Sequence, residues 1–439
     1  MGLDVAPVFP EDLSREKITA IQLERLSRLV DDSLAGNRFW SARLLEAGID
    51  VADGDSVFRY DPVAWSRLPF TTKQDLVADQ DGNPPYGTNL SEPLPSYTRL
   101  HQTSGTTGRP LRWLDTPGTW AAMLEGWQQI FRIAGLAADD RFAFPFSFGP
   151  FIGFWAAFEG AASAGHLCLS GGGMTSLQRL QLMEDNNATV LCCTPTYAMR
   201  LAEVADSSGK DLRRGAVSTL IVAGEPGGSV PGIRQQIETA WGARVIDHWG
   251  MTELGPIAVE CREAPGGMHV LETECLAEVV DRESGELLSP GMEGELVITT
   301  LRRTASPVIR YRTGDLVVAD PEPCACGRAL LRLRGGILGR ADDMITVRGN
   351  NLYPSSIESV IRRVGEVVEF RIHVTEDRQM DRLDVIVEVS ETADGMEVAK
   401  RVATEIRNTF NLAADVTLAE AGSLPRFELK GRRFVVRGN

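Results

Sequence analysis

Short apolar runs alternate with amphipathic stretches through the middle of the chain. The runs have the length of buried strands, and the stretches between them carry apolar residues at helical spacing. The expected strands are 167–170, 189–193, 220–224 and 244–249, and the expected helices are 174–186, 196–208 and 230–241. This alternation predicts an α/β fold with a largely parallel sheet covered by helices. Because ligands of such sheets bind beyond the carboxyl ends of the strands, the glycine-rich segments that end these runs are the first candidates for a functional site.

The pattern changes twice further along the chain. From about residue 276 the segments are short, β-rich and separated by turn-like residues, which predicts a β-rich subdomain. Near Gly339 a second boundary follows, and the helical and alternating apolar patterns beyond it are long enough for a separate core. We therefore expect a large N-terminal domain, 1–338, with mostly parallel helix-covered sheets and the β-rich subdomain, and a small α+β C-terminal domain, 339–439.

The composition excludes several classes of function. A net charge of −15 argues against a mainly electrostatic nucleic-acid binder. No uninterrupted apolar run approaches the ~20 residues that span a bilayer, and the first residues lack the basic start and apolar core of a secretory signal. The seven cysteines are an odd number in a long chain, which favours reduced thiols over a disulfide framework. We expect a cytoplasmic protein.

One loop consists only of small or hydroxyl-bearing residues, which are unsuited to a core. It is formed by Thr103, Ser104, Gly105, Thr106, Thr107 and Gly108. Its glycines allow close backbone approach, and its successive amide groups and hydroxyls can surround an anion such as a triphosphate. The same composition also occurs in plain surface loops, and the GxxxxGK[ST] spacing of the common P-loop is absent.

Four further segments stand in a fixed order after this loop: 223–228, 249–253, 311–316 and 339–343. With them, and with the longer segments 68–76, 308–316 and 339–361, the chain resembles the adenylate-forming superfamily of acyl- and aryl-CoA synthetases, peptide-synthetase adenylation domains and luciferases. It is most similar to the phenylacetate-CoA ligase branch. The resemblance covers nearly the whole chain.

The resemblance implies a binding site for ATP and Mg²⁺. The loop of 103–108 would wrap the β- and γ-phosphates, and the other implied nucleotide-binding residues are Gly224, Glu225, Pro226, His248, Trp249, Gly250, Asp315 and Arg340. Thr252 would touch the α-phosphate, and Glu253 would hold Mg²⁺, an ion that prefers carboxylate and phosphate oxygens. Lys430 stands where the family places its catalytic lysine, whose ammonium would bridge the substrate carboxylate and the α-phosphate.

The resemblance also implies two half-reactions, with an aryl acid and CoA as substrates. The acid attacks the α-phosphorus of ATP, which releases pyrophosphate and leaves an acyl-AMP. The mobile C-terminal domain then turns about a hinge at Asp342, and Arg348, Gly349 and Asn350 line a channel for CoA. An enzyme that loads the phosphopantetheine of a carrier protein would share every ATP residue and stays as the alternative. A non-catalytic nucleotide-binding protein is disfavoured because the implied catalytic residues are all present, and relatives of the branch are often homodimers.

The segment 142–155 is unusually aromatic, which suits a flat apolar acid such as a phenylacetate or a benzoate. The expected acid pocket is formed by Phe144, Phe148, Phe151, Phe154, Gly224, Gly255 and Pro256. Each of these aromatic side chains has an equally good place in a hydrophobic core, so both interpretations stand.

A second candidate site involves sulfur ligands. Cys324 and Cys326 form a CxC pair, and Cys261 and His269 lie upstream at the edge of the β-rich region. The four residues predict a tetrahedral Cys₃His zinc site, which would be structural because four protein ligands leave no open position. The alternative is a set of ordinary reduced cysteines.

Overall fold

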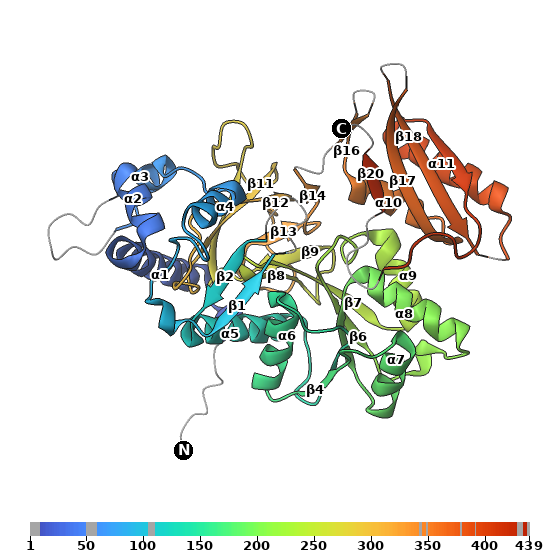
Figure 1. Cartoon of the computed structure of the whole chain (residues 1–439), viewed down its shortest axis with the longest axis horizontal. Helices are drawn as coiled ribbons and strands as arrows, with labels where there is room; N and C mark the ends of the chain where they lie inside the picture. Colours follow the sequence, from blue (N-terminus) through green and yellow to red (C-terminus); the bar gives the residue numbers. More distant parts are fainter. Residues whose placement is uncertain are drawn as a thin grey trace. The chain divides into compact units, whose positions relative to one another are not determined.

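The structure is a computed structural model of the chain. It describes residues 9–49, 59–103, 110–341, 345–347, 350–377, 380–390, 392–427 and 433–436. The chain forms two compact units, one of residues 1–172 and 248–336 and the other of residues 173–247 and 337–439. Figure 1 shows the helices and strands of both units in the order of the sequence.

The first unit combines a helical N-terminal part with several short sheets. Its helices are η1 (Pro10–Asp12), α1 (Arg15–Gly36), α2 (Arg38–Glu46), α3 (Pro62–Arg67), α4 (Lys73–Gly82), η2 (Leu94–Ser96), α5 (Pro117–Ile133) and α6 (Ile152–Ser163). Its strands are β1 (Arg99–Gln102), β2 (Arg112–Asp115), β3 (Arg141–Phe144), β4 (Leu167–Ser170), β8 (Gly255–Glu260), β9 (Gly267–Val270), β10 (Cys275–Val280), β11 (Glu293–Thr300), β12 (Tyr311–Val318) and β13 (Arg332–Arg334), with the end of β7 (Arg244–Met251).

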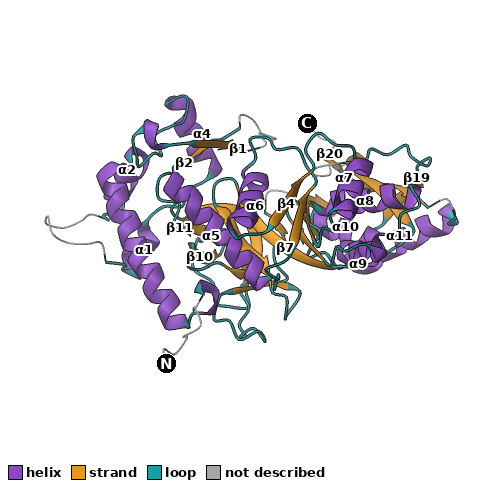
Figure 2. Ribbon diagram, turned by 90° about the horizontal axis from the view of Figure 1, so that it is seen from below, coloured by secondary structure: helices purple, strands orange, loops and turns teal. Residues whose placement is uncertain are grey.

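These strands pair mostly with their neighbours in the sequence. β1 and β2 form an antiparallel hairpin, and β3 and β4 are parallel. β10, β11 and β12 form an antiparallel sheet, while β8 pairs antiparallel with the end of β7 on one side and with β9 on the other. Helices α5 and α6 lie side by side (Figure 2). Gly160 allows this close approach, because a Cβ atom there would lie 2.6 Å from the Cβ atom of Trp127.

The second unit begins with a parallel sheet. Its elements up to residue 247 are α7 (Ser176–Asp185), β5 (Val190–Cys193), α8 (Pro195–Ser207), η3 (Leu212–Arg214), β6 (Thr219–Val222), α9 (Pro231–Trp241) and the start of β7. β5, β6 and β7 are parallel neighbours in that order. Helix α8 begins at Pro195 because the Thr194 side chain caps it, accepting a hydrogen bond from the Tyr197 amide, and because proline is favoured at the first helical position.

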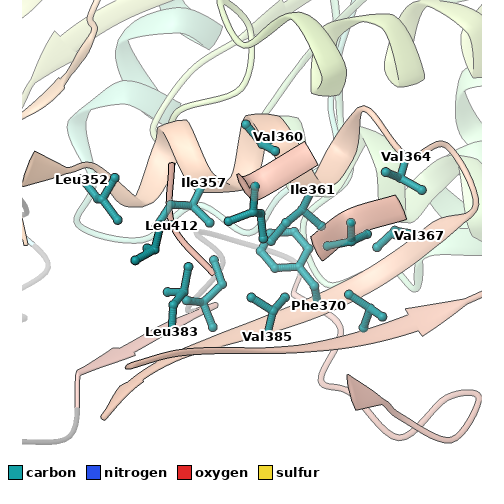
Figure 3. Packing of buried hydrophobic residues seen from close by; sticks show 14 of the residues in the cluster. Leu352, Ile357, Val360, Ile361, Val364, Val367, Phe370, Leu383, Val385 and Leu412 are labelled. Carbon is teal, nitrogen blue, oxygen red and sulfur yellow. The ribbon is translucent and has the colours of Figure 1, made fainter. Parts of the chain in front are cut away.

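The C-terminal part of the second unit is an α+β module with its own core. Its elements are β14 (Gly339–Arg340), β15 (Ile345–Val347), β16 (Asn350–Leu352), α10 (Pro354–Arg362), β17 (Val367–Asp377), β18 (Met380–Val389), α11 (Gly395–Phe410), β19 (Ala414–Leu418) and β20 (Phe434–Val436). The long antiparallel pair β17 and β18 is flanked by β20 and β19, both parallel to their neighbour. Val360 and Ile361 of α10 pack with Phe370 of β17 and with Leu383 and Val385 of β18 (Figure 3).

The predicted α/β class is confirmed, and the strands expected from the alternating pattern are β4, β5, β6 and β7. The predicted parallel pairing holds for β3 with β4 and for β5 with β6 and β7, whereas β8 and β9 continue from β7 in antiparallel order. The second segment of the second unit begins at residue 337. The predicted domain boundary at 338/339 stays a prediction. Among the described residues, no helix combines the length and the apolar character needed to cross a bilayer.

Candidate active site

A closed hairpin holds the ends of the predicted phosphate loop together. Thr103 follows β1, its amide donates to the Leu111 carbonyl over 3.0 Å, and its hydroxyl accepts from the Leu111 amide, also over 3.0 Å. Thr103 is buried, so it fixes the base of the loop. The remaining predicted loop residues lie outside the described residues: Ser104, Gly105, Thr106, Thr107 and Gly108.

The turn between β7 and β8 carries Thr252 and Glu253. Glu253 is only 2 % exposed, and its carboxylate accepts a long hydrogen bond of 3.5 Å from the Tyr311 hydroxyl. Burial raises the pKa of Glu253, while the charges of Lys73 and Arg303 act in the opposite direction. A buried carboxylate whose charge is only partly compensated is well suited to bind a cation.

Two basic residues near Glu253 were not expected in this site. Lys73 is the first residue of α4, where the Thr72 and Asp75 capping box fixes the start of the helix. Lys73 belongs to the segment 68–76 that supports the family resemblance, and it is one of five lysines in the chain, yet neither signal gives it a role. Arg303 follows β11, and no sequence pattern links it to Glu253.

Strand β12 lies beside this turn through Tyr311. The Tyr311 hydroxyl reaches Glu253, and Asp315 stands four residues further along the same strand, beyond an irregularity in the pairing of β12 with β11. Asp315 is buried, and its amide donates to the Thr313 hydroxyl over 3.0 Å. Trp249 is half-buried on β7 opposite Ala258 of β8. The first unit therefore places Glu253 beside Tyr311 at the start of β12, the strand that also carries Asp315.

His248 has a packing role in this structure. Its imidazole is buried against Trp127, with 4.5 Å between the ring centroids. Burial lowers the pKa of His248 to about 3, so the ring is neutral at neutral pH. Its predicted contact with the nucleotide stays a prediction, as does that of Gly250, which is exposed on β7.

The aromatic segment divides between core and surface. Phe144 is fully buried among neighbouring phenylalanines, whereas Phe151 is 37 % exposed at the start of α6. Phe148 is partly buried and contacts Trp155, with ring centroids 4.8 Å apart. Nothing is described of the Phe154 side chain. The structure thus favours the core interpretation for Phe144 and leaves Phe148 and Phe151 as candidates for an acid pocket.

Gly255 and Pro256 begin β8 beside helix α5. Gly255 has a φ of +85°, and a Cβ atom there would meet the Met123 side chain at 3.0 Å. Pro256 lies close to Gly126, since a Cβ atom at that glycine would be 3.3 Å from the proline ring. Both residues therefore occupy a tightly packed turn that could not accept a larger residue at position 255 without rearrangement.

The second unit holds the predicted adenine segment. Gly224 follows β6 with a φ of +91°, and the Glu225 carboxylate accepts a hydrogen bond of 2.8 Å from the Thr196 amide at the start of α8. Pro226 is exposed, and Arg340 is partly exposed on β14. The other predicted residues of this unit, Asp342, Arg348, Gly349 and Lys430, lie outside the described residues, and only the backbone of Asn350 is described, in β16.

The predicted zinc ligands lie together in the first unit. The ligand atoms of Cys261, His269, Cys324 and Cys326 are all within 4.8 Å of one another. The Cys324 and Cys261 sulfurs are 3.9 Å apart, and the Cys326 sulfur is 3.3 Å from His269 Nε2. Tetrahedral zinc with ordinary bond lengths would separate two sulfurs by about 3.8 Å and a sulfur from a nitrogen by about 3.6 Å.

The pKa shifts of His269 and Cys326 favour metal binding, whereas that of Cys261 opposes it in the absence of a metal. Burial, assisted by the charge of Arg328, lowers the pKa of His269 to about 4, so its imidazole is neutral and its ring nitrogen can bind a metal. Burial raises the pKa of Cys261 to about 12. At Cys326 burial acts in the same direction, but hydrogen bonds from the Arg328 amide and from Cys324 outweigh it and lower the pKa. The residues present fit a tetrahedral zinc ion.

Known proteins are similar to this chain over nearly its whole length. The model of the AMP-binding enzyme family matches residues 62–301, and that of the AMP-binding enzyme C-terminal domain matches residues 349–437. Phenylacetate-coenzyme A ligase of Thermus thermophilus is 34 % identical over 440 residues, which cover 95 % of this chain and 96 % of the relative. The protein of the same name from Escherichia coli strain K12 is 30 % identical, covering 96 % of this chain and 95 % of the relative.

Solved structures of a 2-hydroxyisobutyryl-CoA ligase are similar over the same length. Its postadenylation state in complex with 2-HIB-AMP matches with a TM-score of 0.90 at 28 % identity, covering 99 % of this chain and 94 % of that one. Its thioesterification state with 2-HIB-AMP and CoA matches with a TM-score of 0.71 at 29 % identity and the same coverage.

Proposed function

This chain belongs to the AMP-binding enzyme family, and on that basis we propose that it activates an aromatic carboxylic acid and transfers it to CoA. Its relatives make it an AMP-forming acid–CoA ligase, which uses ATP and CoA. The acid carboxylate attacks the α-phosphorus of ATP, releasing pyrophosphate and leaving an acyl-AMP. The CoA thiol then attacks the acyl carbonyl, which releases AMP and leaves a thioester.

The observation that carries this proposal is the environment of Glu253. The carboxylate is buried at the end of β7, contacts Tyr311 and feels the charges of Lys73 and Arg303. In the proposal Glu253 holds Mg²⁺, which neutralises phosphate charge when bound. Thr252 touches the α-phosphate beside it. The loop 103–108 binds the β- and γ-phosphates above its closed base at Thr103.

The C-terminal module, 339–439, supplies the remaining groups in this proposal. Lys430 stabilises the charge that develops between the carboxylate and the α-phosphate during adenylation. A turn of the module about Asp342 then removes Lys430 and brings Arg348, Gly349 and Asn350 to the acyl-AMP as the channel for CoA. The adenine lies along Gly224, Glu225 and Pro226.

The aromatic nature of the acid is the finer part of the proposal. Phe148 and the exposed Phe151 offer flat apolar faces at the start of α6, and two of the relatives are named phenylacetate-coenzyme A ligases. A panel of aryl and aliphatic acids, scored by ATP-dependent pyrophosphate release, tests it. Release with benzoates or phenylacetates supports the proposal, and release with aliphatic acids only would refute it. Comparing CoA with a holo carrier protein as acceptor separates the ligase from a carrier-loading enzyme.

We also propose that Cys261, His269, Cys324 and Cys326 hold a structural zinc ion. The support is their mutual distances and the neutral imidazole of His269. Bound zinc would tie the β8–β9 region to the segment around Cys326. Elemental analysis of the purified protein tests this directly, with one zinc per chain expected. A full-length, folded protein without zinc would refute it.

A further inference from the structure

Arg303 makes three directed contacts while almost completely buried. Its side chain is 3 % exposed and that of Asp115 is fully buried. Arg303 Nε donates to Asp115 Oδ1 over 2.9 Å and Nη2 donates to Asp115 Oδ2 over 2.6 Å, a bidentate pair. The remaining terminal nitrogen, Nη1, donates to the backbone carbonyl of Thr252. One guanidinium thus joins a strand end to the Thr252–Glu253 turn.

The Asp115 end of this bridge belongs to the hairpin that closes the phosphate loop. Asp115 ends β2 and pairs with Arg99 of β1, the strand that leads to Thr103. Its carboxylate also accepts from the Thr119 hydroxyl over 3.1 Å and lies 3.9 Å from His101 Nδ1. These partners hold Asp115 in one position. A shift of the hairpin would therefore move the Asp115 carboxylate and, with it, the Arg303 guanidinium.

At Thr252, Arg303 binds the backbone carbonyl and not the side chain. Because the carbonyl of Thr252 accepts from Arg303, the peptide that joins Thr252 to Glu253 has a defined orientation. The two residues on that peptide are the ones proposed to contact the α-phosphate and Mg²⁺.

We propose that Arg303 is a positioning residue that fixes the β1–β2 hairpin, which carries Thr103 at the base of the phosphate loop, relative to the Thr252–Glu253 turn. This inference rests on the proposed adenylation. The phosphates must be held by both segments at once, and in-line attack tolerates little misplacement. Arg is suited to the task because its planar fork binds a carboxylate with two nitrogens and leaves a third for the carbonyl, which a lysine ammonium cannot match.

Arg303→Lys and Arg303→Met, compared with Arg302→Met, test the inference in the full-length enzyme. Arg302 is the adjacent arginine, but its ion pairs are with Glu125 of α5 and with the buried Glu274 rather than with Asp115. We expect Arg303→Met to lower kcat for acid-dependent pyrophosphate release by on the order of 10²-fold. Arg303→Lys should fall between Arg303→Met and wild type, and Arg302→Met should match wild type.

A second reaction separates positioning from general damage. Thioester formation from chemically prepared acyl-AMP and CoA does not use the β- and γ-phosphates, so it should fall much less than adenylation in the Arg303 variants. Equal loss in both reactions, or an Arg303→Met enzyme within twofold of wild type, would overturn the inference. If Arg303→Met shows no thermal unfolding transition and is therefore unfolded, Arg303→Lys and Asp115→Asn replace it. The same comparison of the adenylation rate with the rate of thioester formation then tests the inference. A wild-type protein without acid-dependent pyrophosphate release would instead refute the proposed function.

Discussion

Arg433→Met should weaken the C-terminal module more than any exposed arginine change there. The Arg433 guanidinium donates to both carboxylate oxygens of Glu369, over 2.6 and 3.0 Å, and to the Thr196 hydroxyl over 3.1 Å. The two charged side chains are 9 % and 5 % exposed. Among the described residues, removing Arg433 leaves the buried Glu369 carboxylate paired only with Arg362 at 3.4 Å, so the loss should lie below the about 3–5 kcal/mol typical of a buried charge without any partner.

The matched control is Arg401→Met in the same module. Arg401 pairs with Glu366, but the side chains are 45 % and 41 % exposed, so solvent screens the pair and its loss should be hard to detect. Native-state hydrogen exchange of amides in β17 and β20 reports the opening free energy of the module separately from the rest of the chain. An Arg433→Met protein no less protected than Arg401→Met would show that the buried pair does not stabilise the module.

Three further predictions concern charge, metal and the active site. Although burial opposes it, Arg433 holds the pKa of Glu369 below its ordinary value, so the stabilisation is present above pH ~4.3, the value of an unperturbed Glu. As the pH falls through the lower pKa of Glu369 in the folded protein, this stabilisation should be lost. The free energy of unfolding, measured by urea titration, should therefore change less between pH 7 and pH 3 for Arg433→Met than for wild type. Cys324→Ser should lose bound zinc by elemental analysis and lower the Tm, whereas Cys168→Ser, away from the cluster, should keep both; an unchanged metal content would exclude Cys324 as a ligand. Glu253→Gln keeps the size of the side chain but not its charge, so acid-dependent pyrophosphate release should fall on the order of 10²-fold or more, without recovery at high Mg²⁺.

Local patterns sufficed to predict the central strands and the C-terminal module. The alternation of apolar runs and helices located β4 to β7 within a few residues. β5 and β6 are continuous apolar runs because they are buried, whereas β4 is an apolar run that is largely exposed. The stripe from Ile357 to Val364 became the core face of α10. The antiparallel continuation through β8 and β9 was not predicted, since pairing direction depends on the turns between strands and not on their composition.

The site was predicted only where a motif carries its residues. Glu253 and Asp315 were predicted through their segments, and Cys261 with His269 through their spacing to the CxC pair; their roles in binding stay predictions. Lys73 and Arg303 could not be found this way, because their link to Glu253 exists only after α4 and the segment following β11 have packed against the β7–β8 turn. Phe144 shows the reverse case, since an aromatic pattern alone does not separate a pocket wall from a core residue.

The most direct test of the central proposal measures both half-reactions in Lys430→Met, with Lys400→Met as the control. Lys400 is exposed on α11 and is expected to behave as wild type. Lys430→Met should lose acid-dependent pyrophosphate release by at least 10²-fold, the order expected when a charge-stabilising donor is removed, and should still form thioester from supplied acyl-AMP and CoA. If Lys430→Met releases pyrophosphate as fast as Lys400→Met, the tail lysine does not act in adenylation and the proposed mechanism is wrong.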